Sequence, residues 1–544
     1  KKRKREKERK REWKEDYENK KRQQRDEKEE EEKQREQPTQ QQHVRYHLTP
    51  DDVVDEEARK NVLKKRRSAV KQMFRHAWEG YKAGAWGHDE VHPVTNTTND
   101  SWGGFGITLV DTLDTLALMK FDDYLEEARE AVSHINYDKD YDASFFETTI
   151  RHLGGLLGAY EMTRDGVFLE KAIDLGERLL ASFNSPTGIP YSIVNLRTKA
   201  AKNHGWTQHH SILSEIGSVQ LEFGALSYFT GDSRYKEVAR KVLEILNKLE
   251  RPFRGLFPVY INNQNAKFES ELVGYGGLSD SFYEYLLKQW LQSGKKDKLM
   301  KKMYQDAVHD LRNNLIQRTY VQIYNSDEMH PHFYISQMQG RTPIKTMEHL
   351  ACFAPGMLAL GHLHGIGFTP THPKPTSPPS SFWEDDKETV LGSMNDLELA
   401  KELAHTCVDL YMDQATGLAP ESVKFHEEKR KSDGWYSVES SVYYLRPETI
   451  ESLYILYYVT GDPHYQDLGW QIYKGIEQYC KTPVAYSSIN DVTAKKPVWS
   501  NSMQSFFFSE TIKYLYLLFS PPSTLNLETR VLTTEAHPLP IEPN

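Results

Sequence analysis

One arrangement recurs along this chain and constrains its fold more than any other feature. An acidic residue opens an apolar helical segment of roughly a dozen residues, a short turn follows, and an amphipathic helix comes next. The segments that fit this arrangement best begin at Glu147, Glu215, Asp280, Glu448 and Glu510. Looser versions begin at Asp111 and His349. The sequence therefore predicts a repeated pair of helices.

The two helices of each pair differ in polarity. The helices opened by an acid are apolar nearly all round, so each must be buried on every side, whereas the next ones, such as residues 234–249, keep one polar face. This difference predicts an inner and an outer ring. Pairs that recur every 60 to 70 residues or so, in a chain with few alternating strand patterns, favour a closed all-α barrel over an open solenoid. The inner helices of such a barrel run the same way, so the acids that open them converge at one end.

Two segments stand outside the pattern. Residues 1–43 consist largely of Lys, Arg, Glu and Gln and cannot bury enough apolar surface to offset chain entropy. We expect them to form a disordered stem or a lone solvated helix, which either holds the rest of the chain away from a membrane or is a featureless charged tail. Residues 369–394 hold five prolines among Ser and Thr, which is typical of a surface insertion between helices. The expected barrel domain spans residues 44–544.

Charge and cysteine content exclude several classes of function. Residues 1–36 hold 17 basic and 13 acidic residues, and the rest of the chain carries a formal charge of −13. A nucleic-acid-binding body would need a basic stripe, so we expect no nucleic-acid partner. Three cysteines without a Cys-x-x-Cys motif exclude a zinc finger. The pairs His330-Pro-His332 and His362-Leu-His364 have no third ligand in register, which argues against metal sites there.

The converging acids have two interpretations. A carboxylate at a helix N-terminus is favoured by the helix dipole and by free backbone N–H groups, so each acid taken alone can be a structural cap. Several acids at matching positions, with Arg151 one turn after Glu147 and Arg446 two residues before Glu448, favour a shared site. Crowded carboxylates raise the pKa of some members, which suits an acid and a base for glycoside hydrolysis. Aromatic residues at the same ends, such as Phe506, either face a sugar ring or belong to the core.

Four motifs then resemble one family. They read Ser144-Phe-Phe-Glu-Thr-Thr-Ile-Arg-His-Leu-Gly-Gly-Leu-Leu, Asp280-Ser-Phe-Tyr-Glu-Tyr-Leu-Leu-Lys-Gln-Trp, Leu445-Arg-Pro-Glu-Thr-Ile-Glu-Ser-Leu and Thr534-Glu-Ala-His-Pro-Leu-Pro. In this order they closely resemble class I α-1,2-mannosidases, glycoside hydrolase family 47, and the resemblance covers about residues 68–540. It implies an (α/α)7 barrel, a bound Ca²⁺, and inverting removal of terminal α-1,2-linked mannose from high-mannose N-glycans.

The same resemblance implies roles for single residues. Glu147 matches the general acid, Glu448 the base that activates water, and Asp280 the third essential carboxylate. Thr534 matches the residue that binds calcium through its hydroxyl and carbonyl oxygens. The positions that line the sugar are matched by Arg151, Glu215, His349, Arg446, Glu451, Phe506, Glu510 and Glu535. The resemblance also implies a disulfide between Cys352 and Cys407, with Cys480 free.

Leu278 departs from part of the family. At this position, two residues before Asp280, the members of the endoplasmic reticulum that remove a single mannose have Arg. Loss of a charged fork there would relax which glycan branch can enter, so we expect Leu278 to lie at the substrate. The resemblance is therefore to the Golgi-like or fungal-type subgroup. It predicts removal of several mannoses down to the five-mannose glycan.

Location and partners follow from the same features. Sequons at Asn96 and Asn99, the implied disulfide and the charged stem fit the lumen of the secretory pathway, either Golgi or endoplasmic reticulum. The chain has no run of eighteen apolar residues that could span a bilayer. We expect a signal anchor upstream, as in a type II membrane protein, and a monomer that acts on high-mannose glycoproteins. The main alternative is a mannosidase-like glycan-recognition protein of endoplasmic-reticulum-associated degradation. A further one is a helical scaffold whose acids only cap helices.

Overall fold

The structure is a computed structural model that describes residues 56–322, 329–371, 387–426 and 434–543. These residues belong to one compact unit, Thr49–Asn544. The expected stem at residues 1–43 lies outside the described residues, as does most of the expected insertion at 369–394. The last part of that insertion is helical, in α15 (Lys387–Ser393), because all of its prolines lie before residue 380.

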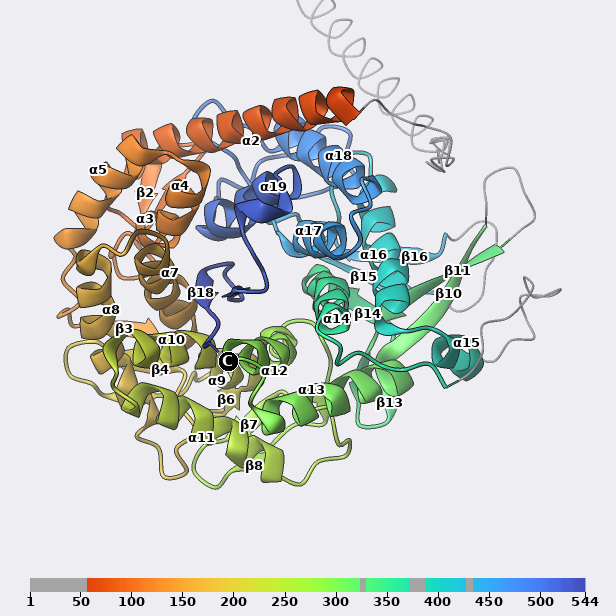
Figure 1. The fold of residues 1–544 in the computed structure, drawn as a ribbon, viewed down its shortest axis with the longest axis horizontal. Helices are drawn as coiled ribbons and strands as arrows, with labels where there is room; N and C mark the ends of the chain where they lie inside the picture. Colours follow the sequence, from red (N-terminus) through yellow and green to blue (C-terminus); the bar gives the residue numbers. More distant parts are fainter. Residues whose placement is uncertain (1–55, 323–328, 372–386, 427–433, 544) are drawn as a thin grey trace, which may run out of the picture. The chain divides into compact units, whose positions relative to one another are not determined.

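Seven helices of the described residues form an inner ring (Figure 1). Each packs against the next along the chain, and η5 closes the ring against α4. They are buried nearly all round: in α12 every residue after Asp280 is buried. In chain order they are α4 (Leu113–Met119), α7 (Gly154–Thr163), α10 (Gln220–Thr230), α12 (Asp280–Gln292), α14 (Ala354–Leu363), α17 (Glu448–Thr460) and α19 (Lys513–Leu518).

An outer ring of helices covers the inner one, and each outer helix packs on one or two inner helices. These helices bury one stripe only. In α11, for example, Tyr235, Ala239 and Val242 face inward at helical spacing. In chain order they are α2 (Glu56–Ala85), α5 (Asp122–Ser133), α8 (Gly166–Leu179), α11 (Arg234–Lys248), α13 (Lys298–Asp310), α16 (Asp396–Met412) and α18 (His464–Tyr479). The (α/α)7 barrel expected from the sequence is therefore confirmed.

Glycines let α7 approach its neighbours closely. A Cβ at Gly155 would lie 2.5 Å from the carbonyl oxygen of Val110, which is backbone and cannot move aside. A Cβ at Gly158 would lie 2.7 Å from Oδ2 of Asp114 on α4. The Gly-Gly-Leu-Leu-Gly run is thus a packing requirement of the inner ring.

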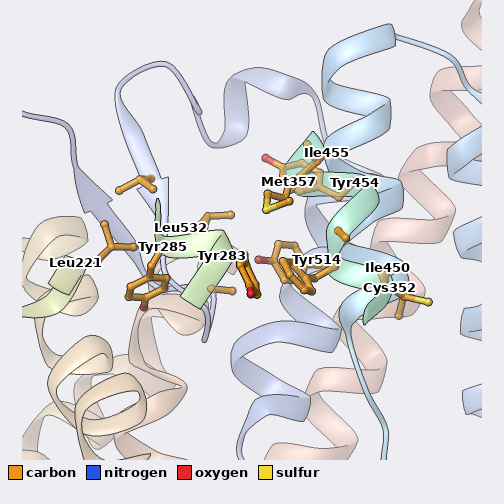
Figure 2. Packing of buried hydrophobic residues seen from close by; sticks show 14 of the residues in the cluster. Leu221, Tyr283, Tyr285, Cys352, Met357, Ile450, Tyr454, Ile455, Tyr514 and Leu532 are labelled. Atoms are coloured by element: carbon orange, nitrogen blue, oxygen red, sulfur yellow. The ribbon is translucent and has the colours of Figure 1, made fainter. Parts of the chain in front are cut away.

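A C-terminal hairpin, β17 (Arg530–Leu532) and β18 (Pro538–Pro540), lies inside the ring (Figure 1). β17 packs on α12, and β18 packs on α7 and α10. The loop between the strands includes buried Thr533, Glu535 and His537. Aromatic side chains fill the space around the hairpin: Figure 2 shows Tyr285 beside Leu532, with Tyr514 across from them. The hairpin therefore fills the barrel and brings its loop among the inner helices.

Short helical turns and small antiparallel sheets connect the rings. The remaining helical segments are α3 (Ile107–Asp111), α6 (Phe145–Glu147), η1 (Thr148–Leu153), η2 (Leu180–Phe183), α9 (Leu213–Gly217), η3 (Leu311–Leu315), η4 (His349–Phe353), η5 (Phe507–Ile512) and η6 (Pro522–Thr524). The sheets are β1 (Glu90–His92) with β2 (Thr97–Asn99); β3 (Asp142–Ser144), β4 (Ile193–Asn195) and β5 (Ala201–Lys202); β6 (Ser211–Ile212), β7 (Tyr260–Asn262) and β8 (Lys267–Phe268); β9 (Leu272–Val273), β12 (Gln337–Gln339) and β13 (Thr342–Ile344); β14 (Thr346–Glu348), β15 (Ser422–Phe425) and β16 (Tyr436–Ser440); and β10 (Ile316–Gln322) with β11 (Met329–Ile335).

A disulfide joins Cys352 of η4 to Cys407 of α16, which confirms the implied pairing, and Cys480 is free and buried. Across the described residues, we find no helix with the length and apolar character needed to cross a bilayer.

Candidate active site

The predicted acids lie at or just before the starts of inner helices. Asp280 is the first residue of α12 and Glu448 the first of α17. Glu147 instead ends the single turn α6 and precedes the π-helical turn η1, whereas Glu510 lies within the π-helical turn η5. Glu215 lies in α9, one short helix before α10. The 3.6-residue period could not reveal these turns, because a π-helix inserts an extra residue, commonly at functional sites.

Arg151 holds Glu147 at one side of the site. The Ser144 hydroxyl accepts a hydrogen bond from the Glu147 backbone N–H at 3.3 Å and so caps the turn. Arg151 Nε donates to Glu147 Oε2 at 2.8 Å, and it lies 3.8 Å from Glu535 Oε1. The guanidinium also donates to Ser505 Oγ at 2.9 Å, and its carbon lies 5.7 Å from the ring centroid of Phe506. Buried Arg151 therefore connects η1, the residues just before η5, and the hairpin loop.

His349 and Arg446 hold Glu448 at the other side. His349 Nδ1 lies 2.8 Å from Glu448 Oε2, and Arg446 Nη1 lies 3.9 Å from Glu448 Oε1. Burial alone would raise the pKa of Glu448, but the hydrogen bond with His349 and the charges of His349 and Arg446 lower it below its ordinary value. The other ring nitrogen of His349 lies 2.7 Å from the hydroxyl of Tyr411. Glu448 is thus held as an oriented carboxylate.

Asp280 has the opposite electrostatic setting. Burial raises its pKa to about 7, and the negative charges of Glu348 and Glu448 add to this rise, against a hydrogen bond from the Ser281 N–H. That N–H donates to Asp280 Oδ1 at 2.8 Å. The negative charges of Glu448 and Asp280 both raise the pKa of Arg446, so these two acids lie in one region.

Further acids fill the space between these groups. Burial raises the pKa values of Glu510 and Glu535 well above the ordinary range, and the charge of Glu535 adds to the rise at Glu510. Glu448 adds to the field at Glu510, as Glu147 does at Glu535. Burial and the charges of Glu284 and Glu448 likewise raise the pKa of Glu451 to about 8, against the opposing charge of Lys288. The structure therefore brings the three main acids into one electrostatic cluster.

Three non-glycine residues beside this cluster have left-handed backbone. Their φ angles are +72° at Leu278, +64° at Leu445 and +59° at Ala536. Such conformations are costly for L-residues and persist where surrounding contacts impose them, commonly at functional sites. The Leu278 carbonyl accepts a hydrogen bond from Ser214 N at 3.0 Å, so Leu278 lies next to the turn that carries Glu215. Glu215 itself pairs with His204, with 3.4 Å between Oε1 and Nε2.

Thr534 lies in the hairpin loop, and its N–H donates to the hydroxyl of Tyr285 at 3.2 Å. Within the described part of the chain, the buried Oε1 of the adjacent Glu535 accepts no hydrogen bond. Buried carboxylates that repel one another beside hydroxyl and carbonyl oxygens form the kind of donor set that a hard cation such as Ca²⁺ prefers. The residues present therefore fit a calcium ion.

The sequence interpretation missed several residues of this region. Glu421 accepts two hydrogen bonds from Arg446, at 2.7 and 2.5 Å. Glu348 accepts one from the Gly277 N–H at 2.5 Å. Glu348 could have been found from the sequence, because it is adjacent to His349. Glu421 directly precedes strand β15 and Tyr411 belongs to outer helix α16, and no sequence pattern marks either of them as a site residue. A separate group, His332, His405 and Asp409, has donor atoms that could hold a metal ion.

Comparisons with known proteins agree with the fold. Residues 73–541 match the family described as glycosyl hydrolase family 47. The mannosyl-oligosaccharide 1,2-alpha-mannosidase MNS1 of Arabidopsis thaliana is 43% identical over 494 residues, which cover 90% of this chain and 80% of that protein. The endoplasmic reticulum mannosyl-oligosaccharide 1,2-alpha-mannosidase of Homo sapiens is 40% identical over 486 residues, which cover 88% of this chain and 64% of that protein. The solved structure of the alpha-1,2-mannosidase from Trichoderma reesei superposes with a TM-score of 0.77 at 29% identity, over 88% of this chain and 99% of that one. The chain therefore belongs to glycosyl hydrolase family 47.

Proposed function

We propose that this chain is an inverting exo-glycosidase that removes terminal α-1,2-linked mannose from high-mannose N-glycans. The observation that carries the proposal is that two acids of one cluster are each held by different partners. Glu448 is held as a carboxylate by His349 and Arg446, and Glu147 is held by Arg151 on a different inner-helix start. An inverting hydrolase needs such a pair, in which one group accepts a proton from water while the other protonates the leaving oxygen.

Each acid has one role in this proposal. Glu448, whose pKa is lowered, is the base that takes a proton from the attacking water. Glu147 is the acid that protonates the leaving oxygen, and Arg151 fixes its orientation through the 2.8 Å contact. Asp280 adds a third carboxyl beside Glu448, and its pKa of about 7 keeps the total negative charge of the site low near neutral pH. Phe506, which lies against Arg151, offers an apolar face to the sugar.

Thr534 would hold the calcium ion through its hydroxyl and carbonyl oxygens. When bound, the ion supplies a high-coordination centre that can fix sugar hydroxyls and waters. Glu535, Glu510 and Glu451 would orient those waters, since all three are buried and share one cluster. Lys513 holds the loop that carries Thr534 in place, because its Nζ donates a hydrogen bond to the Ala536 carbonyl at 2.6 Å.

We further propose that trimming continues to the five-mannose glycan. Leu278 supports this end point, since it places no guanidinium beside Asp280 that would restrict which glycan branch can enter. Overall identity does not separate the subgroups, because the human relative named for the endoplasmic reticulum is 40% identical and the human relative named IB is 37% identical. The names of such relatives support a place in the secretory pathway, in which the chain acts as a monomeric lumenal part behind a type II anchor. A purely glycan-recognising role is not favoured, because relatives that cover most of the chain are named as enzymes.

Timed digestion of the nine-mannose glycan tests the proposal. The wild-type chain with calcium should cleave α-1,2-linked mannose with inversion, so that NMR detects β-mannose as the first-formed anomer, and should stop at five mannoses. Glu147→Gln and Glu448→Gln should each lower kcat by about 100-fold or more, in keeping with the loss of a general acid or base. Glu130→Gln, at an exposed acid of α5, is the control and should leave kcat unchanged.

A calcium chelator in the same assay separates the metal requirement from the acid–base roles. Removal of calcium should abolish release, and added Ca²⁺ should restore it. Glycan binding without any release by the calcium-loaded wild type would overturn the enzyme proposal in favour of a recognition protein. A stall after one mannose would overturn the proposed end point alone.

A further inference from the structure

A second group of possible metal ligands lies where strand β11 packs on outer helix α16. His405 and Asp409 stand four residues apart on α16, so they share one face of the helix. His332 comes from β11, and its side chain is almost fully buried. One ligand atom from each of the three residues lies within 4.8 Å of the others. Tertiary packing thus gives His332 two partner donors, whereas the sequence offered the His330-Pro-His332 motif no third ligand.

The spacing of the donor atoms suits a small divalent ion. Asp409 Oδ2 lies 2.6 Å from His332 Nε2 and 3.3 Å from His405 Nδ1. In a tetrahedral zinc site with bonds of about 2.0–2.2 Å, neighbouring donors lie about 3.3–3.5 Å apart. The distance from His405 to Asp409 already fits, whereas the distance from His332 to Asp409 has to widen from 2.6 Å to about 3.3–3.5 Å when the ion binds.

The chemistry of the group distinguishes it from the proposed calcium site. Two imidazoles and one carboxylate are the donors that Zn²⁺ prefers, whereas Ca²⁺ takes oxygen ligands. The His405 side chain is 54% exposed, so a water can complete the coordination. We propose that His332, His405 and Asp409 bind one Zn²⁺ ion.

Such an ion would tie the β10–β11 hairpin to α16. The link between them already includes a hydrogen bond from the Thr406 hydroxyl to the Phe333 carbonyl at 2.7 Å. Trp435 covers the buried ring of His332, with ring centroids 5.0 Å apart. Further along α16, Tyr411 contacts His349 of the candidate active site, so the ion would stabilise the helix that supports that histidine. The ion itself lies outside the acid cluster and takes no part in the proposed hydrolysis.

Isothermal titration with ZnCl₂ tests the proposal on tag-free chain that has been stripped with a chelator and then saturated with Ca²⁺. Saturation with Ca²⁺ keeps the acid cluster occupied, so that new binding reports on other sites. The wild type should bind one equivalent of Zn²⁺, and bound Zn²⁺ should raise Tm. His405→Ala should weaken this binding by about 100-fold or more and remove the Tm rise. Because His405 is exposed, this variant should fold normally, which mannose release and circular dichroism check.

His134→Ala is the matched control. His134 also faces a carboxylate four residues away on an exposed surface, with 3.9 Å to Glu130 Oε1, but no third donor joins this pair among the described residues. It should leave Zn²⁺ binding unchanged. Co²⁺ provides a second measurement, since visible absorption bands of a low-symmetry nitrogen and oxygen site should appear in the wild type and disappear in Asp409→Asn. Equal Zn²⁺ affinity in wild type and His405→Ala, or no binding by the wild type, would overturn the proposal and leave an ion pair between His332 and Asp409.

Discussion

At the scale of single residues, the pKa values of two carboxyl groups in one site shift in opposite directions. Burial acts on both Asp280 and Glu448, yet the pKa of Asp280 rises to about 7 while that of Glu448 falls. The difference comes from partners: Glu448 has His349 and Arg446, whereas Asp280 faces other carboxylates. The partners of each carboxyl group therefore decide the direction of its pKa shift, even where burial is shared.

His349→Ala should move the acidic limb of the kcat/KM profile toward higher pH. Loss of the hydrogen bond and positive charge raises the pKa of Glu448, so the base becomes protonated at a pH where it was ionised before. Activity should fall more at pH 5 than at pH 7, apart from any uniform loss. Tyr411→Phe, which keeps the His349 contact to Glu448, should leave the position of that limb in place. A parallel drop in the profile of His349→Ala would contradict this account.

Leu278→Arg should restrict the extent of trimming. A guanidinium two residues before Asp280 would add a bidentate hydrogen-bond donor to the substrate site and favour one glycan branch over the others. We expect release of the first mannose to persist, while later steps slow by about 10-fold or more, which timed glycan profiling measures. Leu278→Lys, which lacks the planar fork, is the control with the same charge. The backbone at Leu278 has φ +72°, so both variants carry the same strain.

At the scale of elements, a buried charge group anchors the C-terminal hairpin. His537 Nδ1 lies 2.9 Å from Asp114 Oδ2, and its Nε2 lies 3.0 Å from Asp111 Oδ1. Lys513 Nζ lies 2.9 Å from Asp114 Oδ1. Burial opposes the charge on His537, but the two aspartates outweigh it and raise its pKa to about 9. The loop that carries Thr534 is therefore fixed to α3, α4 and α19 by paired charges.

His537→Gln should destabilise the fold by about 3–5 kcal/mol at pH 7, since it leaves buried aspartates without their partner. The folded pKa lies above the unfolded value, so the contribution of His537 is complete below about pH 6.5 and disappears as pH rises through about 9. The Tm difference between wild type and variant should therefore shrink at alkaline pH.

His152→Gln is the control for that experiment. His152 is also buried, but burial lowers its pKa to about 4, against the fields of nearby aspartates. Its contribution should be constant in the alkaline range and fall only under acidic conditions. A constant Tm gap for His537→Gln between pH 7 and 10 would show that its charge contributes nothing.

At the scale of the whole molecule, ring closure depends on contacts between distant parts of the chain. α2 packs on α19 and on η5, which joins the first described helix to the last inner one. The Cys352–Cys407 disulfide adds a covalent link between η4 and α16 across 55 residues of sequence. Of these two features, only the disulfide also restricts the unfolded chain, because it is covalent.

Replacement of both cysteines by alanine should lower the free energy of unfolding by about 4 kcal/mol, as expected for the loss of a loop of this length. Calorimetry of the oxidised proteins measures the effect as a lower Tm. Cys480→Ala, at a buried cysteine outside any disulfide, should cost only about 1 kcal/mol through a small cavity. Reductant should lower the Tm of the wild type toward that of the double variant, and no change on reduction would contradict this expectation.

Sequence alone determined the architecture, because its signals are local. Helical periodicity separates inner from outer helices, and Asp280 and Glu448 mark inner-helix starts as expected. The Glu147–Arg151 ion pair follows from a spacing of four residues. By contrast, the seven small sheets of the described residues, each of two or three strands and including the long β10–β11 hairpin, come from segments with no pattern strong enough to predict. The proposed catalytic roles, the calcium ion and the stem remain predictions.

Tertiary structure alone decided which distant groups meet. Glu421 pairs with Arg446, Tyr411 orients His349, and His332 joins His405 and Asp409, although each group draws on elements well separated in the chain. Periodicity reports only neighbours within a turn or two of helix, whereas these contacts depend on how rings and strands pack. The π-helical turns at η1 and η5 likewise escape a 3.6-residue pattern. Local spacing thus specified the barrel, and packing over long sequence distances set the charges inside it.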